Sequence, residues 1–194
     1  MNNITKPPLF YLKLIAIILA GALIWAGVNF YNAKKEEKER KAKQAELQKT
    51  EVLPQVGFKA PDITLKGLDG KLHSLNDARG KPYLINFWAS WCGPCEMEAP
   101  DLVRMYDKYK KDVEIFAVNA TIGDPVQEAS AFADRHGFKF PVLLDMDGVA
   151  GLDYKVFSLP TTFFVNKDGI IVEQVRGVLP PDQLEEKFKK LIES

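Results

Sequence analysis

The nine residues Phe87-Trp88-Ala89-Ser90-Trp91-Cys92-Gly93-Pro94-Cys95 decide the fold, because they join two predicted elements and contain both cysteines of the 194-residue chain. The run from Tyr83 to Trp88 is apolar and aromatic except for one asparagine, which predicts a buried central strand. Beyond Cys92, apolar residues recur at helical spacing, at Leu102, Met105, Tyr106 and Tyr109. The cysteine pair is therefore expected where a strand turns into a helix.

This position predicts redox chemistry for the two cysteines. A helix N-terminus presents unpaired amides and about half a positive charge, so it favours the thiolate form of Cys92. We expect Cys92 to be exposed enough to attack a substrate disulfide, and Cys95 to resolve the mixed disulfide. The alternative is half of a zinc site, whose other ligands would have to come from His73, His136 and carboxylates.

Strand and helix patterns alternate through the rest of the globular part, which predicts a mixed sheet covered by helices on both faces. Residues 63–65 and 71–75 flank Gly67-Leu68-Asp69-Gly70 and predict a hairpin. Asp124 is the predicted N-cap of a helix that Gly137 closes. The other predicted elements are strands at 113–118, 141–144, 161–165 and 170–175, a short helix at 149–154 and a final helix with Leu184, Phe188, Leu191 and Ile192 on one face.

The charges are unevenly distributed although the formal net charge is zero. Residues 1–51 carry nine basic and five acidic side chains, which leaves 17 basic and 21 acidic side chains for residues 52–194. The globular part is thus mildly acidic and has no basic stripe, which argues against a nucleic-acid partner.

The N-terminal part predicts a membrane anchor. Residues 1–8 form a short tail, residues 9–31 are apolar except for Lys13 and Asn29, and 23 helical residues span about 34 Å, enough for a hydrocarbon core of about 30 Å. Residues 32–51 predict a charged helical stalk, and residues 52–194 the globular domain. A cleavable signal peptide is the alternative, but the apolar run continues beyond its small residues Ala20-Gly21-Ala22.

The distribution of basic residues around the anchor predicts the opposite side of the membrane from the one that the resemblance described below implies for the C-terminal domain. Lys6 precedes the apolar segment and Lys13 lies near its start, whereas six Lys/Arg residues follow it between Lys34 and Lys43. A count of basic residues alone would place the C-terminal domain in the cytoplasm.

The segment 87–95, together with Pro100, closely resembles the thioredoxin active site. Ala60-Pro61-Asp62, the predicted hairpin and Glu98-Ala99-Pro100 resemble the TlpA/ResA-like branch of that superfamily. The resemblance covers about residues 55–192. It implies an α/β thioredoxin-like fold: a mixed central sheet flanked by helices, with an N-terminal hairpin and a central helical insertion, preceded by one transmembrane helix.

The resemblance also implies roles for individual residues. Leu159-Pro160-Thr161 resembles the family's cis-proline loop, which faces the cysteines and binds an extended substrate together with Trp91, Gly93 and Pro94. Glu98 matches the acid that the branch uses near its cysteines, where it can relay a proton to Cys95. Thioredoxin carries a buried aspartate in the preceding strand, whereas this chain has Asn86 there.

The resemblance implies an extracytoplasmic, membrane-anchored thiol–disulfide oxidoreductase that needs no metal or organic cofactor. We expect it to reduce disulfides in substrate proteins, such as apocytochrome c or envelope proteins, with electrons from a CcdA/DsbD-type membrane donor. A disulfide donor with the same residues is one alternative. A thiol peroxidase is another, although peroxiredoxins usually have Thr or Ser three residues before the reactive cysteine and Pro seven before, where this chain has Ala89 and Ile85.

Overall fold

The computed structural model describes residues 9–78 and 80–194. The chain divides after Leu47 into an N-terminal unit and a compact unit of residues 48–194, each of which is described by itself.

A single helix, α1 (Leu9–Thr50), covers both the predicted anchor and the predicted stalk. By length and composition, it is suited to cross a membrane. Its charged half contains the ion pairs Lys35–Glu39 and Lys41–Glu37, both at the i, i+4 spacing that favours a helix. The helix does not change at residue 31, so the boundary between anchor and stalk remains a prediction from composition.

The compact unit is built on a five-stranded sheet in the order β5-β4-β3-β6-β7. The central strand β3 (Tyr83–Trp88) is buried at every residue, as its apolar composition predicts. It is parallel to β4 (Glu114–Asn119) and antiparallel to β6 (Thr161–Val165), so the sheet is mixed. The edge strands are β5 (Val142–Leu144) and β7 (Ile171–Arg176).

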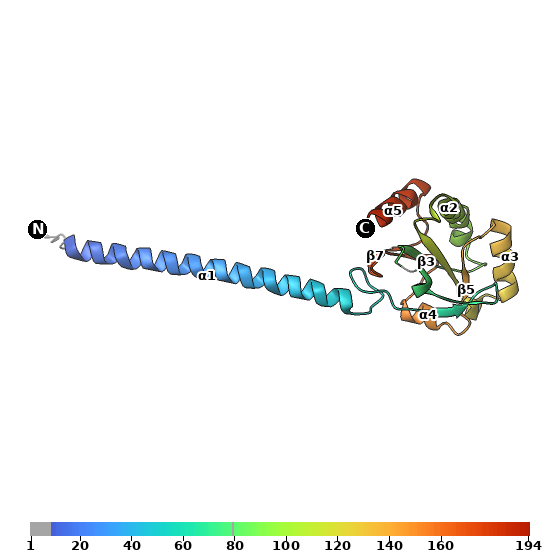
Figure 1. Ribbon diagram of the computed structural model, residues 1–194, viewed down its shortest axis with the longest axis horizontal. Helices are drawn as coiled ribbons and strands as arrows, with labels where there is room; N and C mark the ends of the chain where they lie inside the picture. The colour runs from blue at the N-terminus through green and yellow to red at the C-terminus, as the bar shows by residue number, and fades with distance from the viewer. Residues whose placement is uncertain (1–8, 79) are drawn as a thin grey trace, which may run out of the picture. The chain divides into compact units, whose positions relative to one another are not determined.

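Helices cover both faces of this sheet. The helices α2 (Gly93–Tyr109), α3 (Val126–His136) and α5 (Pro181–Glu193) contribute to one core, with Leu84 and Trp88 from β3. The short helix α4 (Val149–Asp153) and the 3-10 turn η1 (Leu75–Ala78) contribute to the other core, with Ile85 and Phe87. Figure 1 shows α4 on the opposite side of the sheet from α2 and α5. Residues of β3 alternate between the two cores, so the predicted mixed sheet with helices on both faces is confirmed.

The predicted N-terminal hairpin is present as β1 (Thr64–Lys66) and β2 (Leu72–Ser74), paired antiparallel. Its turn extends the main sheet at the β5 edge, because Leu68 N–H donates to Val142 O at 3.0 Å. At the other edge, Ala60 N–H donates to Gly169 O at 2.9 Å. Backbone that precedes β3 therefore covers both edges of the sheet, which limits pairing with other chains.

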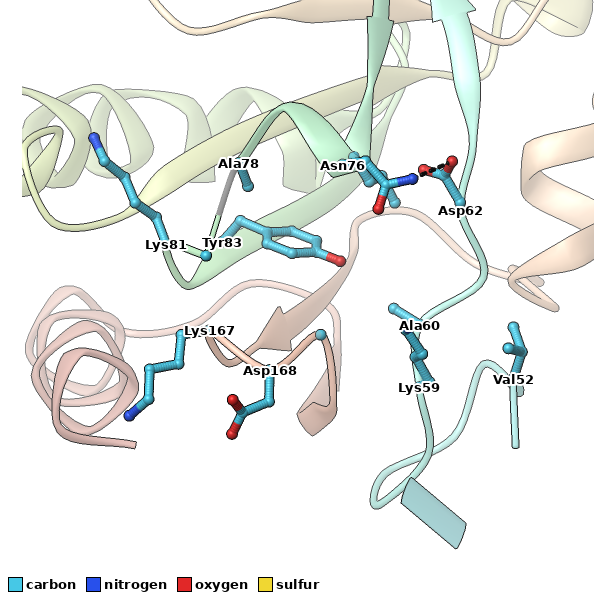
Figure 2. Close-up of a pocket in the computed structure, with 13 residues that line it drawn as sticks. Val52, Lys59, Ala60, Asp62, Asn76, Ala78, Lys81, Tyr83, Lys167 and Asp168 are labelled. Carbon is cyan, nitrogen blue, oxygen red and sulfur yellow. Dashed lines mark hydrogen bonds between the residues drawn. The ribbon is translucent and has the colours of Figure 1, made fainter. Parts of the chain in front are cut away.

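A pocket lies at the start of β3, the end away from the cysteines (Figure 2). It is lined by Lys59, Lys81, Lys167, Asp62 and the ring of Tyr83. Burial raises the pKa of Tyr83 to about 12, so its hydroxyl stays protonated at neutral pH. We assign this pocket no part in the chemistry, because it lies at the end of β3 away from the cysteines.

Candidate active site

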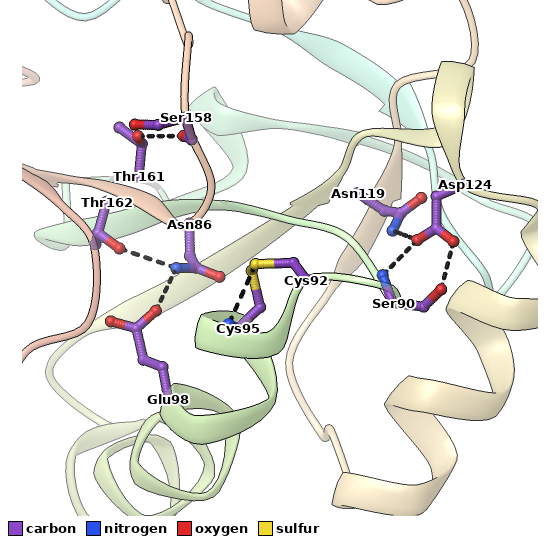
Figure 3. Close-up of a disulfide and its surroundings, with 10 residues drawn as sticks. All are labelled: Asn86, Ser90, Cys92, Cys95, Glu98, Asn119, Asp124, Ser158, Thr161 and Thr162. Carbon is purple, nitrogen blue, oxygen red and sulfur yellow. Dashed lines mark hydrogen bonds between the residues drawn. A yellow bond between two sulfur atoms is a disulfide. The ribbon is translucent and has the colours of Figure 1, made fainter.

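The two cysteines form a disulfide at the N-terminus of α2 (Figure 3). Their sulfurs are 2.08 Å apart and their Cα atoms 5.2 Å apart. Cys92 is the N-cap residue, and its Sγ accepts a hydrogen bond from Cys95 N–H at 3.2 Å. The predicted strand-to-helix junction is thus present. When the pair is reduced, this amide and the helix dipole are placed to stabilise a thiolate at Cys92.

Both cysteines are largely buried in the disulfide form. Cys92 is 5% exposed and Cys95 3% exposed, and both belong to the core beside Trp88 and Ala99. In this disulfide form, the N-cap position turns the Cys92 sulfur back onto the first turn of α2. That Cys92 is exposed enough to attack a substrate disulfide concerns the reduced form and stays a prediction. The neighbouring Trp91 is 65% exposed, so the surface beside Cys92 is accessible although the sulfur is largely covered.

Glu98 is buried on the face of α2 that carries Cys95, one turn further along the helix. Its Oε2 accepts a hydrogen bond from Asn86 Nδ2 at 3.1 Å, and the same amide donates to Thr162 Oγ1 at 2.9 Å (Figure 3). Its Oε1 is also buried, and the backbone N–H of Leu179 lies near this carboxyl. Glu98 is only 1% exposed, so it is not a solvated residue of the helix surface.

Burial gives Glu98 the titration behaviour of a general acid–base group. Desolvation raises the pKa of its carboxyl to about 7, against a smaller lowering by the Asn86 hydrogen bond. A carboxyl with this pKa can both accept and release a proton near neutral pH. Glu96, which follows Cys95 directly, behaves in the opposite way, since hydrogen bonds from Arg135 and His136 lower its pKa.

The loop before β6 contains a cis peptide bond between Leu159 and Pro160. Thr161, the first residue of β6, pairs with Phe87 in β3, and its hydroxyl donates to Ser158 O at 2.7 Å. This pairing places Pro160 beside the C-terminal end of β3, from which the chain turns into Cys92. The structure therefore brings the predicted cis-proline loop and the predicted cysteine site to the same end of the sheet.

A second buried carboxylate, Asp124, holds the turn that precedes Cys92. It accepts hydrogen bonds from Ser90 N–H at 2.7 Å, from Ser90 Oγ at 2.5 Å and from Asn119 Nδ2 at 2.6 Å (Figure 3). Trp91 Nε1 donates to Gly123 O at 2.9 Å in the same region. We name Ser90, Asn119 and Asp124 the Asp124 cluster. It fixes the backbone that leads into the reactive cysteine.

The Asp124 cluster corrects one sequence prediction. Asp124 does not cap α3, whose N-cap is Pro125 with no side-chain hydrogen bond. Its carboxylate instead accepts hydrogen bonds from Asn119 in β4 and from Ser90 in the turn before Cys92. Gly137 does close α3, with a φ of 72° that suits glycine. The position of Asp124 just before a predicted helix does not indicate that its hydrogen-bond partners come from other elements.

Within the part of the chain that the structure describes, no cluster of three or more His, Cys, Asp or Glu side chains is arranged to hold a metal. His73 Nε2 lies 2.9 Å from Asp69 Oδ1, and His136 Nε2 lies 2.9 Å from Glu96 Oε1. The two histidines named for the zinc alternative are thus engaged with carboxylates.

Comparison with known proteins supports the same interpretation. The model of the AhpC/TSA family matches residues 56–174. The thiol-disulfide oxidoreductase ResA of Bacillus cereus is 35% identical over 187 residues, which cover 96% of this chain and 98% of the relative. The thioredoxin-like protein YneN of Bacillus subtilis is 39% identical over 141 residues, which cover 72% of this chain and 82% of the relative.

Two solved structures are also similar. A protein described as a DsbE-type thiol:disulfide interchange protein from Chlorobium tepidum has a TM-score of 0.64 and 33% identity, and the match covers 69% of this chain and 95% of that one. StoA from Bacillus subtilis has a TM-score of 0.58 and 28% identity, with 66% and 96% covered. The fold and the cysteine site define a thiol–disulfide oxidoreductase with a thioredoxin-like fold. More narrowly, the chain belongs to the ResA-like thiol–disulfide oxidoreductases of the thioredoxin superfamily.

Proposed function

We propose that this protein reduces disulfides in extracytoplasmic substrate proteins, with Cys92 as the attacking residue, Cys95 as the resolving residue and Glu98 as the proton carrier. The observation that carries the proposal is the buried Glu98 carboxyl on the cysteine face of α2, with a pKa of about 7. Gly93-Pro94 between the cysteines supports the reducing direction, since thioredoxin has the same dipeptide and a potential near −270 mV.

The first step is the attack of the Cys92 thiolate on one sulfur of the substrate disulfide. A bond forms between Cys92 Sγ and that sulfur, the substrate S–S bond breaks, and the other substrate sulfur leaves as a thiolate. The N–H of Cys95 and the helix N-terminus stabilise the Cys92 thiolate before the attack. Trp91, Gly93 and Pro94 are exposed beside Cys92 and receive the substrate. The Leu159–Thr161 loop, which is largely buried, borders this surface with its backbone.

The second step resolves the mixed disulfide. The Cys95 thiol transfers its proton to the Glu98 carboxylate, and the resulting thiolate attacks Cys92 Sγ. The mixed disulfide breaks, the second substrate thiolate leaves, and the Cys92–Cys95 disulfide is formed. Two electrons have then passed from the protein to the substrate, so each turnover requires a reductant that restores the dithiol.

We further propose that a CcdA/DsbD-type membrane protein supplies these electrons and that apocytochrome c or envelope proteins are the substrates. The apolar half of α1 supports a membrane location for the exchange reaction, because it is long enough to span a bilayer. The relatives' names support the disulfide chemistry alone.

The test is the reduction potential of the Cys92–Cys95 couple in the full chain, kept in detergent and equilibrated with defined thiol buffers. A value near or below about −250 mV supports a reductant that is supplied by a membrane donor. A value near about −120 mV, which is typical of the strong oxidant DsbA, would make the protein a disulfide donor and reverse the proposed electron flow.

A further inference from the structure

The loop between β7 and α5 approaches the buried carboxyl of Glu98. Its residues 177–180 are Gly-Val-Leu-Pro and carry no charged side chain. The backbone N–H of Leu179 lies near the carboxyl and acts on its pKa. The Leu179 side chain is 7% exposed and belongs to the core that also contains Cys95 and Ala99 of α2. The helix that follows the loop, α5, packs against α2 (Figure 1).

This loop is held in place at both ends. At its start, Gly177 has a φ of 89°, which suits glycine, and its N–H donates to Pro160 O at 2.8 Å. At its end, Pro180 has a φ of −54° and a ψ of 143°, and its carbonyl accepts a hydrogen bond from Leu184 N–H at 2.9 Å. Leu179 stands between these fixed points and precedes a proline, which restricts its backbone to extended conformations. The loop therefore keeps Leu179 close to the carboxyl.

The charge of Glu98 depends mainly on how little water reaches its carboxyl. Desolvation raises the pKa of Glu98 to about 7, and the charge of Asp101, three residues further along α2, acts in the same direction. Asp101 forms an ion pair with Arg104 at 2.7 Å. The amide of Asn86 and the backbone N–H of Leu179 lower the pKa of Glu98. Apolar cover thus outweighs the hydrogen-bond donors at this carboxyl.

We propose that Leu179 is a positioning residue of the exchange reaction, which keeps water from the carboxyl of Glu98 and so sets the pH range in which Glu98 accepts the proton of Cys95. The inference rests on the proposed role of Glu98 as the proton carrier and adds the residue that controls it. Leu179 takes no proton and forms no bond in the reaction. A shorter side chain at this position would admit water to the carboxyl, which favours its charged form.

The experiment follows the two steps of exchange separately at a series of pH values. The full chain, reduced and kept in detergent, is mixed with one equivalent of 5,5′-dithiobis(2-nitrobenzoate). The attack of Cys92 on this disulfide releases the first coloured thiolate, and the attack of Cys95 on the resulting mixed disulfide releases the second. In the unchanged protein, the rate of the second release should reach half its maximum near pH 7, because Glu98 must be ionised to accept the proton.

Leu179→Ala is the test variant, and it should lower this midpoint by about one pH unit, a ten-fold change in proton affinity. Leu179→Met keeps an apolar side chain of similar volume and should leave the midpoint unchanged. Leu191→Ala is the matched control, because it removes the same atoms from the same core, about 15 Å along α5 from the first residue of that helix. If Leu179→Ala does not fold, Leu179→Val takes its place, with a smaller shift in the same direction.

Glu98→Gln separates this inference from the proposed function, because it should remove the midpoint near pH 7 from the second release. If it does so while Leu179→Ala keeps the midpoint of the unchanged protein, the role of Leu179 is overturned and that of Glu98 stands. An equal shift in Leu191→Ala would also overturn the inference, since any loosening of the core would then have the same effect. If Glu98→Gln leaves the profile unchanged, Glu98 is not the proton carrier, and the inference fails with that part of the proposed function.

Discussion

At the scale of single residues, the carboxyl of Glu98 makes stability depend on pH. Its pKa is about 7 in the folded protein and 4.5 ordinarily, so the folded state holds a proton that the unfolded state releases between these values. The stability that this proton provides is complete below pH 4.5 and is lost as the pH rises through 7. The shift corresponds to a free energy of about 3 kcal/mol.

We therefore predict that the free energy of unfolding of oxidised residues 48–194 falls between pH 5 and pH 8, and that Glu98→Gln removes most of this fall. Denaturation by guanidinium at several pH values measures it. Glu96→Gln is the control on the same helix: its pKa is lowered rather than raised, so it should leave the fall in place. An unchanged pH profile in Glu98→Gln would contradict the assignment of this pKa.

A second prediction concerns Asn86, whose amide donates to both Glu98 and Thr162. The hydrogen bond favours the charged form of Glu98, so Asn86→Leu should raise the pKa of Glu98 further above its ordinary value. If Glu98 accepts the Cys95 proton, the pH at which disulfide exchange reaches half its maximal rate should rise as well.

Thr162→Val is the matched control, because it removes the other acceptor and leaves the Asn86–Glu98 hydrogen bond intact. The pH–rate profiles of the two variants should therefore differ in their midpoints. Identical midpoints would mean that Asn86 has a structural role only.

At the scale of elements, the Asp124 cluster joins the end of β4 to the turn before Cys92. Asp124 is 1% exposed and accepts three hydrogen bonds, so Asp124→Ala leaves buried donors without a partner. We expect a loss of about 3 kcal/mol in the free energy of unfolding. Denaturant titration followed by tryptophan fluorescence measures it, because Trp91 is bonded to Gly123 next to Asp124.

Asp147→Ala is the control for this prediction. Asp147 is exposed and accepts a single hydrogen bond from Val149 N–H, at 3.2 Å, so its loss should cost about 1 kcal/mol or less. A similar loss in both variants would show that the Asp124 cluster adds no special stability to the turn.

The same elements show what the sequence can and cannot predict. The strand at Tyr83–Trp88, the hairpin before it and the helix after Cys92 were predicted correctly, because apolar periodicity and turn residues act locally. The partners of Asp124 and Glu98 were not predicted. Both carboxylates accept hydrogen bonds from side chains of other elements, Ser90 in the turn before Cys92 and Asn86 in β3, and sequence spacing contains no information on such contacts.

At the scale of the whole molecule, α1 combines an apolar half with a charged half in one helix. Its exposed apolar side chains, which include Ile17, Leu23 and Trp25, require lipid or a partner to cover them. We predict that the full chain is recovered with membranes and is released by detergent but not by high salt. Residues 48–194 alone should be recovered in the soluble fraction, and their retention on membranes would show that α1 is not the anchor.

The orientation of the anchor decides whether a membrane electron donor is needed. Six basic residues follow the apolar segment, whereas only Lys6 precedes it and Lys13 lies near its start. This distribution favours a cytoplasmic domain, but the proposed function requires the opposite side. We predict that Ser194→Cys, in a chain with Cys92→Ser and Cys95→Ser, reacts with a membrane-impermeant maleimide in intact cells or spheroplasts.

Asn3→Cys in the same chain is the matched control and should react only after lysis. The reverse pattern would place the domain in the cytoplasm. Glutathione and thioredoxin keep cysteine pairs reduced there, so Cys92 and Cys95 would obtain electrons without a membrane donor. The proposed CcdA/DsbD-type partner would then have no role, although the exchange chemistry of the site would be unchanged.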